Sequence, residues 1–289
     1  MLYHYTSLAG LIGVINNKSI WASHCEFLND SNEFSHALSF AKGYSSNIFM
    51  EDDYLAVFGW VVRDSLEKMQ KHDVFVCSFS EKPDLLSQWR GYCPQGSGIC
   101  IGFDEDKIRQ FCDKYGFKLE KCIYDIKAQE TKILSYLNEC LEKFPKPELT
   151  RAEYDALDTS GRCEHELRYR VLVETGTNKE LAYGATSVFC ENINDIAFLM
   201  KDYGFHEESE WRIICSNPSN KKEFRHSNSH IIPYITLPLI EEFKDSIKEI
   251  IIGPNPEKHR CKKSIEHLVE SNGLESIEIK LSKIPFNSW

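Results

Sequence analysis

The sequence has 289 residues and a formal net charge of −10, with 42% hydrophobic and 27% charged residues. This is the composition of an ordinary globular protein with a buried core, because 17 Phe, 13 Tyr and 5 Trp need a dry interior. The acidic balance excludes a broad basic surface of the kind that neutralises nucleic-acid phosphates, although it leaves room for a local basic groove.

The first predicted element is a strand at residues 2–5. Thr6 or Ser7 can cap the following helix, because the apolar residues between 8 and 15 have helical spacing. A second strand is expected at 19–23. Asp30 and Glu33 then form a capping-box pattern, and we expect Asp30 to accept backbone N–H groups at the start of a helix. Another helix is expected over 52–70.

In the middle of the chain, strands are expected at 74–80, 98–103 and 117–124, and helices at 85–89, 106–115 and 128–143. The segment 144–184 is more polar and contains two prolines and three glycines, which predicts an insertion or irregular structure. We expect it to interrupt a single domain covering residues 1–289.

The last third predicts helices at 187–201 and 256–269, and strands at 206–215, 231–237, 247–252 and 276–281. Strands and helices therefore mix without a regular βαβ period, which favours an α+β fold over a doubly wound sheet.

The opening residues lack the basic flank of a secretory signal, and the apolar runs fall short of the roughly 20 residues that span a membrane. Eleven cysteines are scattered singly, without a C-x-x-C pair. A chain of this length does not depend on disulfides, so we expect a cytoplasmic protein without a membrane partner, whose thiols are mostly small core residues.

Several common sites are missing from the sequence. It contains no G-x-x-x-x-G-K-S/T phosphate loop, no G-x-G-x-x-G and no G-x-S-x-G elbow. The adjacent ligand types at 24–25 and 163–165 lack the paired spacing of a zinc site, so no metal is expected.

What remains is a set of polar residues in apolar strands. His4 lies in the first strand, where it is either a functional residue or a satisfied core or rim histidine. Ser78 and Ser80 share one face of their strand, and Glu208 and Glu210 do likewise at the entry to a later strand. Two carboxylates on one face repel unless they face water or a cation, so an exposed sheet edge is the alternative for that pair.

Short motifs lie along the chain at residues 2–7, 10–15, 20–23 and 28–33, then at 78–81, 89–92, 98–104 and 208–212, and finally at 252–254 and 282–285. Together these motifs resemble a bacterial family, the domain-of-unknown-function family 2971. The resemblance spans nearly the whole chain except 144–184. The resemblance implies a family and leaves its activity open.

The opening strand and helix also resemble the ADP-ribosyltransferase fold, including its DNA-modifying toxin branch. This resemblance implies a split mixed or antiparallel sheet surrounded by helices. The roles that it implies by position are NAD binding for His4 and Thr6, a central role for Ser78 and Ser80 or for Tyr92, and catalysis for Glu210, with Glu208 positioning the acceptor. The sequence departs from the pattern of this fold in two ways. Ser80 and Tyr92 compete for the central role, and His4 together with the E-x-E pair of Glu208 and Glu210 combines features of two branches of the fold.

The implied activity is cleavage of the nicotinamide–ribose bond of NAD and transfer of ADP-ribose to an unidentified protein or nucleic-acid acceptor, in a toxin or phage-defence setting. Such cleavage passes through an oxocarbenium-like cation, whose positive charge the Glu210 carboxylate could stabilise electrostatically. Tyr92 could stack on nicotinamide and Arg90 could bind the pyrophosphate, or the two could be ordinary core and surface residues. Because neighbouring carboxylates repel, Glu210→Gln is expected to leave stability unchanged or to raise it.

Two other classes of protein stay open. A non-catalytic interaction protein on the same fold would use Trp21, Trp89 and Trp211 as core anchors. A metal-dependent nuclease would use four carboxylates as ligands, but the sequence lacks the lysine or histidine that accompanies such carboxylates at short spacing. Those four ligands would be Asp30, Glu33, Glu208 and Glu210.

Overall fold

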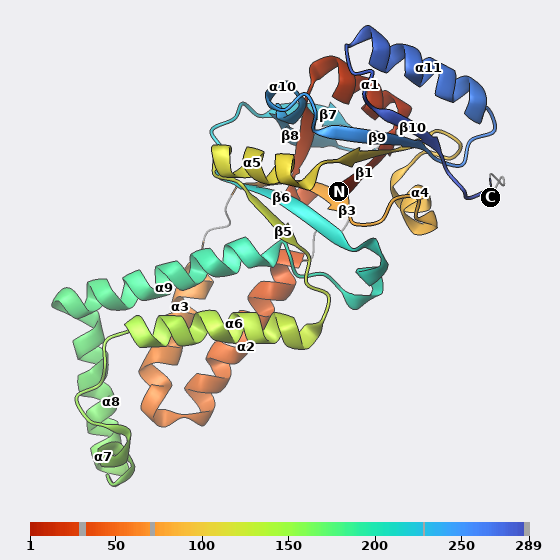
Figure 1. Ribbon diagram of the computed structural model, residues 1–289. Coiled ribbons are helices and arrows are strands. Elements are labelled where there is room, and N and C mark those ends of the chain that lie inside the picture. Colours follow the sequence, from red (N-terminus) through yellow and green to blue (C-terminus); the bar gives the residue numbers. More distant parts are fainter. Residues whose placement is uncertain (29–32, 70–72, 228, 286–289) are drawn as a thin grey trace. The chain divides into compact units, whose positions relative to one another are not determined.

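The computed structural model describes residues 1–28, 33–69, 73–227 and 229–285. The chain forms two compact units, each assembled from separate stretches of sequence (Figure 1). Unit 1 comprises Met1–Ser31, Asp73–Cys122 and Lys201–Trp289, and unit 2 comprises Asn32–His72 and Ile123–Met200. All the candidate site residues named above, apart from the carboxylates at 30 and 33, lie in described parts of unit 1.

A sheet forms the centre of unit 1. Its strands are β1 (Leu2–Ser7), β2 (Ile20–His24), β3 (Val74–Ser80), β4 (Gly98–Phe103), β5 (Lys118–Lys121), β6 (Glu210–Ser216), β7 (Glu223–His226), β8 (Ile231–Leu237), β9 (Ile247–Ile252) and β10 (Glu278–Leu281). The order is β10-β9-β4-β1-β3-β2-β8-β7, while β6 pairs with β3 and β5. Only β10 and β9 are parallel among these pairs. The expected α+β class with a mixed, largely antiparallel sheet is confirmed.

One face of this sheet carries the hydrophobic core of unit 1. The helices of the unit are α1 (Leu8–Asn17), α4 (Leu86–Tyr92), α5 (Glu105–Tyr115), α10 (Leu239–Glu242) and α11 (Lys258–Ser271), with short 3₁₀ helices η1 (Cys25–Phe27) and η3 (Tyr203–Glu208). Buried residues of α1, α5 and α11 pack against alternate residues of the strands, among them Leu11, Ile101, Phe111, Ile213 and Ile265. Nine of the eleven cysteines are buried and all are free thiols, as expected of small core residues.

The junction between β1 and α1 depends on a glycine. Ser7 caps α1, since its Oγ accepts a hydrogen bond from the Gly10 backbone N–H at 3.0 Å. A Cβ atom at position 10 would lie 2.0 Å from Thr6 Oγ1, which is far inside van der Waals contact. The first turn of α1 therefore packs against Thr6 only because position 10 has no side chain.

Unit 2 is helical. It contains α2 (Glu33–Glu51), η2 (Asp53–Leu55), α3 (Ala56–Lys68), α6 (Ile126–Lys143), α7 (Arg151–Asp155), α8 (Thr159–Glu174) and α9 (Gly176–Ala197). Figure 1 shows α2, α3, α6 and α9 running alongside one another. The polar segment 144–184 belongs to this unit and forms α7, α8 and the beginning of α9. The expected capping role of Asp30 lies outside the described residues.

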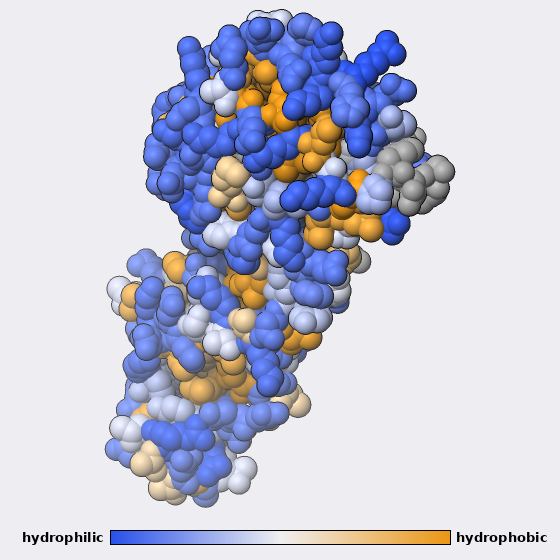
Figure 2. All heavy atoms as spheres, turned by 45° about the vertical axis from the view of Figure 1, so that its right-hand side comes forward, coloured by the Kyte–Doolittle hydropathy of each residue, from blue (hydrophilic) through white to orange (hydrophobic). Residues whose placement is uncertain are grey.

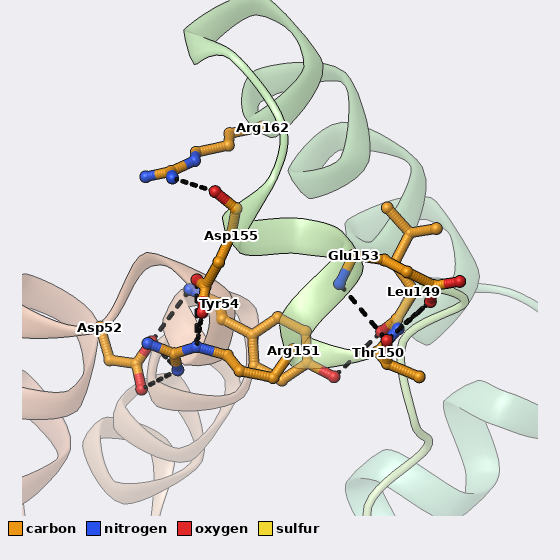
Figure 3. A network of polar contacts seen from close by, with 8 residues as sticks. All are labelled: Asp52, Tyr54, Leu149, Thr150, Arg151, Glu153, Asp155 and Arg162. Carbon is orange, nitrogen blue, oxygen red and sulfur yellow. Dashed lines mark hydrogen bonds and ion pairs between the residues drawn. The ribbon is translucent and has the colours of Figure 1, made fainter.

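A polar network ties α7 to η2 within unit 2 (Figure 3). Arg151 Nη1 lies 2.8 Å from both carboxylate oxygens of Asp52, which precedes η2. Tyr54 Oη donates to the Leu149 carbonyl oxygen at 3.0 Å. The segment leading into α7 is thus held by both an ion pair and a hydrogen bond.

Hydrophilic side chains cover most of the face drawn in Figure 2, and hydrophobic ones gather in smaller patches. Among the described residues, none of the helices combines the length and the apolar character needed to cross a bilayer.

Candidate functional site

The candidate site is built around β3, whose two edges are paired differently. One edge pairs with β6 along residues 74–80. The other edge is divided between two strands, because β2 pairs with Phe75 and Val76 whereas β1 pairs with Ser80 alone. Residues 77–79 therefore border an opening where β1 and β2 part.

His4 occupies this opening. Its Nδ1 lies 2.9 Å from the carbonyl oxygen of Ser78, and its ring centroid is 5.8 Å from that of Phe79. A carbonyl oxygen only accepts, so Nδ1 carries the hydrogen. Burial lowers the pKa of His4, which keeps the ring neutral and leaves Nε2 as a hydrogen-bond acceptor.

Ser78 and Ser80 lie on the face of β3 opposite the core, directly across from Arg212 and Glu210 of β6. Directly opposed residues of an antiparallel pair point to the same side of the sheet. Four polar side chains from two strands therefore project together.

Glu208 reaches this group by a turn and not by strand alternation. The strand was expected to include Glu208, but β6 begins at Glu210 and Glu208 ends the η3 turn. Between them Ser209 has a left-handed backbone with φ of 44°. Ser80 Oγ donates to the Glu208 carbonyl oxygen at 2.6 Å, which fixes the turn against β3.

Two buried cations bind the two carboxylates. Lys201 Nζ lies 2.8 Å from Glu210 Oε2 and also forms an ion pair with Glu208 Oε2. Arg212 binds Glu210 in a bidentate manner, because its Nε donates to Oε1 at 2.8 Å and its Nη2 donates to Oε2 at 3.1 Å. The alternative of an exposed edge is wrong for Glu210, whose exposed fraction is 6%.

This network fixes the charge of its members. Burial opposes ionisation of Glu210, but Arg212 and Lys201 outweigh it and lower the pKa of the carboxyl group to about 2. Burial likewise opposes the charged form of Lys201, yet Glu210 and Glu208 raise its pKa well above the usual range. Tyr92 Oη donates to Glu208 Oε1 at 2.9 Å. Glu210 is therefore held as an anion, and Glu208 is bound by two neighbouring donors, Lys201 and Tyr92.

A cavity of about 330 Å³ collects most of the residues singled out in the sequence. The predicted residues that line it are His4, Ser78, Ser80, Tyr92, Glu208 and Glu210. An adjoining cavity of about 880 Å³ is lined by Thr6 and shares several residues with the first. The shared residues are His4, Tyr5, Trp21, Ser23, Tyr92 and Arg225. The roles of the predicted site residues in binding and catalysis stay predictions.

Arg90 lies apart from this group. It is exposed on α4 and lines neither of the two cavities, so the structure gives no support to a role in binding pyrophosphate there. Sequence reasoning also missed Lys201, Arg212 and Arg225. Arg212 stood within a recognised motif, whereas Lys201 and Arg225 carried no local signal.

The arrangement does not suit a metal ion. Among the described residues, no group of three or more His, Cys, Asp or Glu side chains could hold one. Oxygens of Glu208 and Glu210 are bound by Lys201 and Arg212, whose charges would repel a metal. The other two nuclease ligands, at positions 30 and 33, have side chains outside the described residues.

The fold and the site thus define an α+β protein with a cavity, lined by both polar and apolar side chains, at the division of its sheet. Residues 88–213 match the model of a family described as a protein of unknown function (DUF2971). This segment contains Tyr92, Glu208 and Glu210, while His4 and Ser78 precede it. No curated protein and no solved structure matches the chain.

Proposed function

We propose that the protein is an ADP-ribosyltransferase-like enzyme that uses NAD and transfers ADP-ribose to a macromolecular acceptor. The observation that carries this proposal is the convergence of β1, β3, β6, α4 and η3 on one cavity lined by a neutral histidine, two serines, a tyrosine and two carboxylates. The volumes of this cavity and the adjoining one, about 330 and 880 Å³, are within the range of ligand pockets.

The proposed reaction breaks the bond between ribose C1′ and the nicotinamide nitrogen. Nicotinamide leaves as a neutral molecule with the electron pair, and C1′ becomes an oxocarbenium-like centre. A nucleophile of the acceptor, or water, forms the new bond to C1′ and gives up its proton to solvent. The protein must therefore bind the ribose and stabilise the positive charge that develops at C1′.

His4 and the two carboxylates suit these tasks differently. The neutral His4 can accept a hydrogen bond from a ribose hydroxyl through Nε2. Glu210, with a pKa of about 2, cannot take up a proton at neutral pH and acts as a fixed charge that holds Lys201 and Arg212. The Glu208 side chain is the more exposed, at 13% against 7%, so we assign the contact with the ribosyl cation to Glu208.

The experiment is to incubate the purified chain with NAD and quantify nicotinamide by chromatography. The proposal predicts slow release with water as the acceptor, and a loss of about a hundred- to a thousand-fold in Glu208→Gln. Lys201 keeps Glu210 as its partner in this variant. The matched control is Glu207→Gln, an exposed carboxylate one residue away. No release above the uncatalysed rate at millimolar NAD would contradict the proposal.

One observation favours a second candidate, a ligand-binding protein without catalysis on the same fold. Lys201 and Arg212 balance the charges of Glu208 and Glu210. The cluster therefore has no net negative charge that would stabilise a ribosyl cation. Under this candidate the chain binds NAD, or another ligand of the cavity, without releasing nicotinamide.

A further inference from the structure

Arg225 is a partly buried cation of the site that, among the residues the structure describes, forms no ion pair with a carboxylate. It lies in β7, is partly buried, and lines both cavities. Its Nη2 donates to Ser23 Oγ at 3.1 Å, and its Nε is buried without a hydrogen-bond partner. In the part of the chain that the structure describes, no carboxylate lies within ion-pair distance of Arg225, in contrast to Lys201 and Arg212.

A partly buried guanidinium without a carboxylate partner among the described residues lowers the stability of the fold unless a ligand binds it. Burial lowers the pKa of Arg225, because desolvation disfavours the cation and the interaction with Tyr234 offsets that effect only in part. The buried Nε–H of Arg225 is left without an acceptor, which costs stability, whereas a bound anion would give the guanidinium charge-assisted hydrogen bonds. The position of Arg225 is therefore explained better by a ligand than by the stability of the sheet.

An aromatic surface lies beside this guanidinium. The Trp21 ring packs against Tyr234 at a tilt of 33° with 4.5 Å between centroids, yet Trp21 remains 41% exposed. Trp21 lines the same two cavities as Arg225. Ser23, which binds Arg225, is paired with Tyr234 across β2 and β8. An arginine fork and an accessible indole therefore both line the two adjoining cavities.

We propose that Arg225 binds the diphosphate of a nucleotide, with Trp21 offering a ring face to the base. The planar guanidinium presents several N–H donors in a fork that matches phosphate oxygens, and aromatic rings stack on any nucleobase. Identifying this nucleotide as NAD rests on the proposed function. The diphosphate contact itself does not, because it is argued from the lack of a carboxylate partner for Arg225 among the described residues.

The test is isothermal titration of the full chain with ADP and with adenosine. ADP should bind more tightly than adenosine. Arg225→Gln should weaken ADP binding on the order of tenfold to a hundredfold and leave adenosine unchanged. Arg225→Lys should lie between, since lysine keeps the charge but not the fork. Trp21→Ala should weaken both ligands.

Arg90→Gln is the matched control, because Arg90 lies outside both cavities, and it should bind ADP as the unmodified chain does. The melting temperature of Arg225→Gln should be unchanged or higher, which separates lost binding from lost folding. The proposal is overturned if ADP binds no better than adenosine, or if Arg225→Gln binds ADP normally. It is also overturned if a short single-stranded oligonucleotide binds through Arg225 while ADP does not.

These outcomes separate the two proposals. If ADP binding depends on Arg225 but NAD yields no nicotinamide, the diphosphate site stands and the proposed enzyme fails. If nicotinamide is released and Arg225→Gln leaves KM for NAD unchanged, the enzyme stands and the assignment of Arg225 is wrong.

Discussion

The imidazole of His4 and the carbonyl of Ser78 meet at 2.9 Å across the opening where β1 and β2 part along β3. This contact satisfies a backbone acceptor in the middle of a strand, which would otherwise need a ladder partner. It also fixes the tautomer of His4, and so determines that Nε2 is the acceptor on the ring that lines the cavity.

Two substitutions of His4 separate its structural role from its proposed binding role. His4→Asn keeps a short side-chain N–H donor near the Ser78 carbonyl but removes the Nε2 acceptor. It should stay within about 1 kcal/mol of the original free energy of unfolding, yet lose ribose binding and nicotinamide release. His4→Ala leaves the carbonyl unsatisfied and should cost about 1–3 kcal/mol. Urea denaturation and nicotinamide release measure the two effects. A fully active His4→Asn would remove His4 from the proposed site.

Glu210→Gln should destabilise the protein, contrary to the expectation from sequence. Repulsion between neighbouring carboxylates does not govern this site, because Lys201 and Arg212 bind them. Removing the Glu210 charge takes one carboxylate away from two buried cations at once, although Lys201 keeps Glu208, and a change of this kind typically costs about 3–5 kcal/mol. Urea denaturation measures this effect. Glu207→Gln is exposed and should change stability by less than about 0.5 kcal/mol. Equal stability of the two variants would show that the ion pairs contribute little.

Stability should fall as the pH drops from 7 to 5, in part because of His4. The native state lowers the pKa of His4 below its ordinary value of 6.5, so the unfolded state takes up the proton first. The stability due to neutral His4 is present above pH 6.5 and is lost as the pH falls. His4→Asn should have a flatter profile over this window, measured as the urea midpoint at each pH. Parallel profiles would mean that His4 protonates freely in the native state.

At lower pH the same reasoning applies to Glu210. Its pKa is about 2 in the native state against an ordinary value of 4.5, so its contribution is present above pH 4.5 and is lost toward pH 2. A shift of this size corresponds to roughly 3 kcal/mol of stability. The stability of Glu210→Gln should therefore depend less on pH between 4.5 and 2. When the variant and the unmodified chain start from the same stability, the variant should unfold at the lower pH.

Two glycines of α1 should respond to alanine in opposite directions. Gly10→Ala places a Cβ 2.0 Å from Thr6 Oγ1 and should cost about 1–3 kcal/mol, as overpacking does. At position 13 nothing lies within 4 Å of an added Cβ, so Gly13→Ala should stabilise the helix by about 0.5–1 kcal/mol. Thermal unfolding of both variants checks this pair. A harmless Gly10→Ala would show that β1 and α1 do not meet as described.

Local patterns in the sequence predicted local structure well. The helix cap at Thr6 or Ser7, which the structure places at Ser7, follows from spacing and propensity, which act between near neighbours. The strand at 74–80 and the shared face of Ser78 and Ser80 follow in the same way. The helices of unit 2 within 144–184 were harder to predict, because their polar composition resembles that of a loop.

The electrostatics of the site depended on contacts that no local pattern records. Lys201 follows the long helix α9 and meets Glu210 only through the turn at Ser209. Arg225 lies in a four-residue strand that gave no periodic signal. The sequence therefore indicated which polar residues to consider, but their charge partners were visible only in three dimensions.

A structure of the chain soaked with NAD tests the central claim most directly. The account predicts that the ribose next to nicotinamide lies beside His4 and Glu208, that nicotinamide lies against Tyr92, and that the diphosphate is bound by Arg225. NAD bound elsewhere on the chain, or no bound NAD at millimolar concentration, would contradict the claim that this cavity is an NAD site.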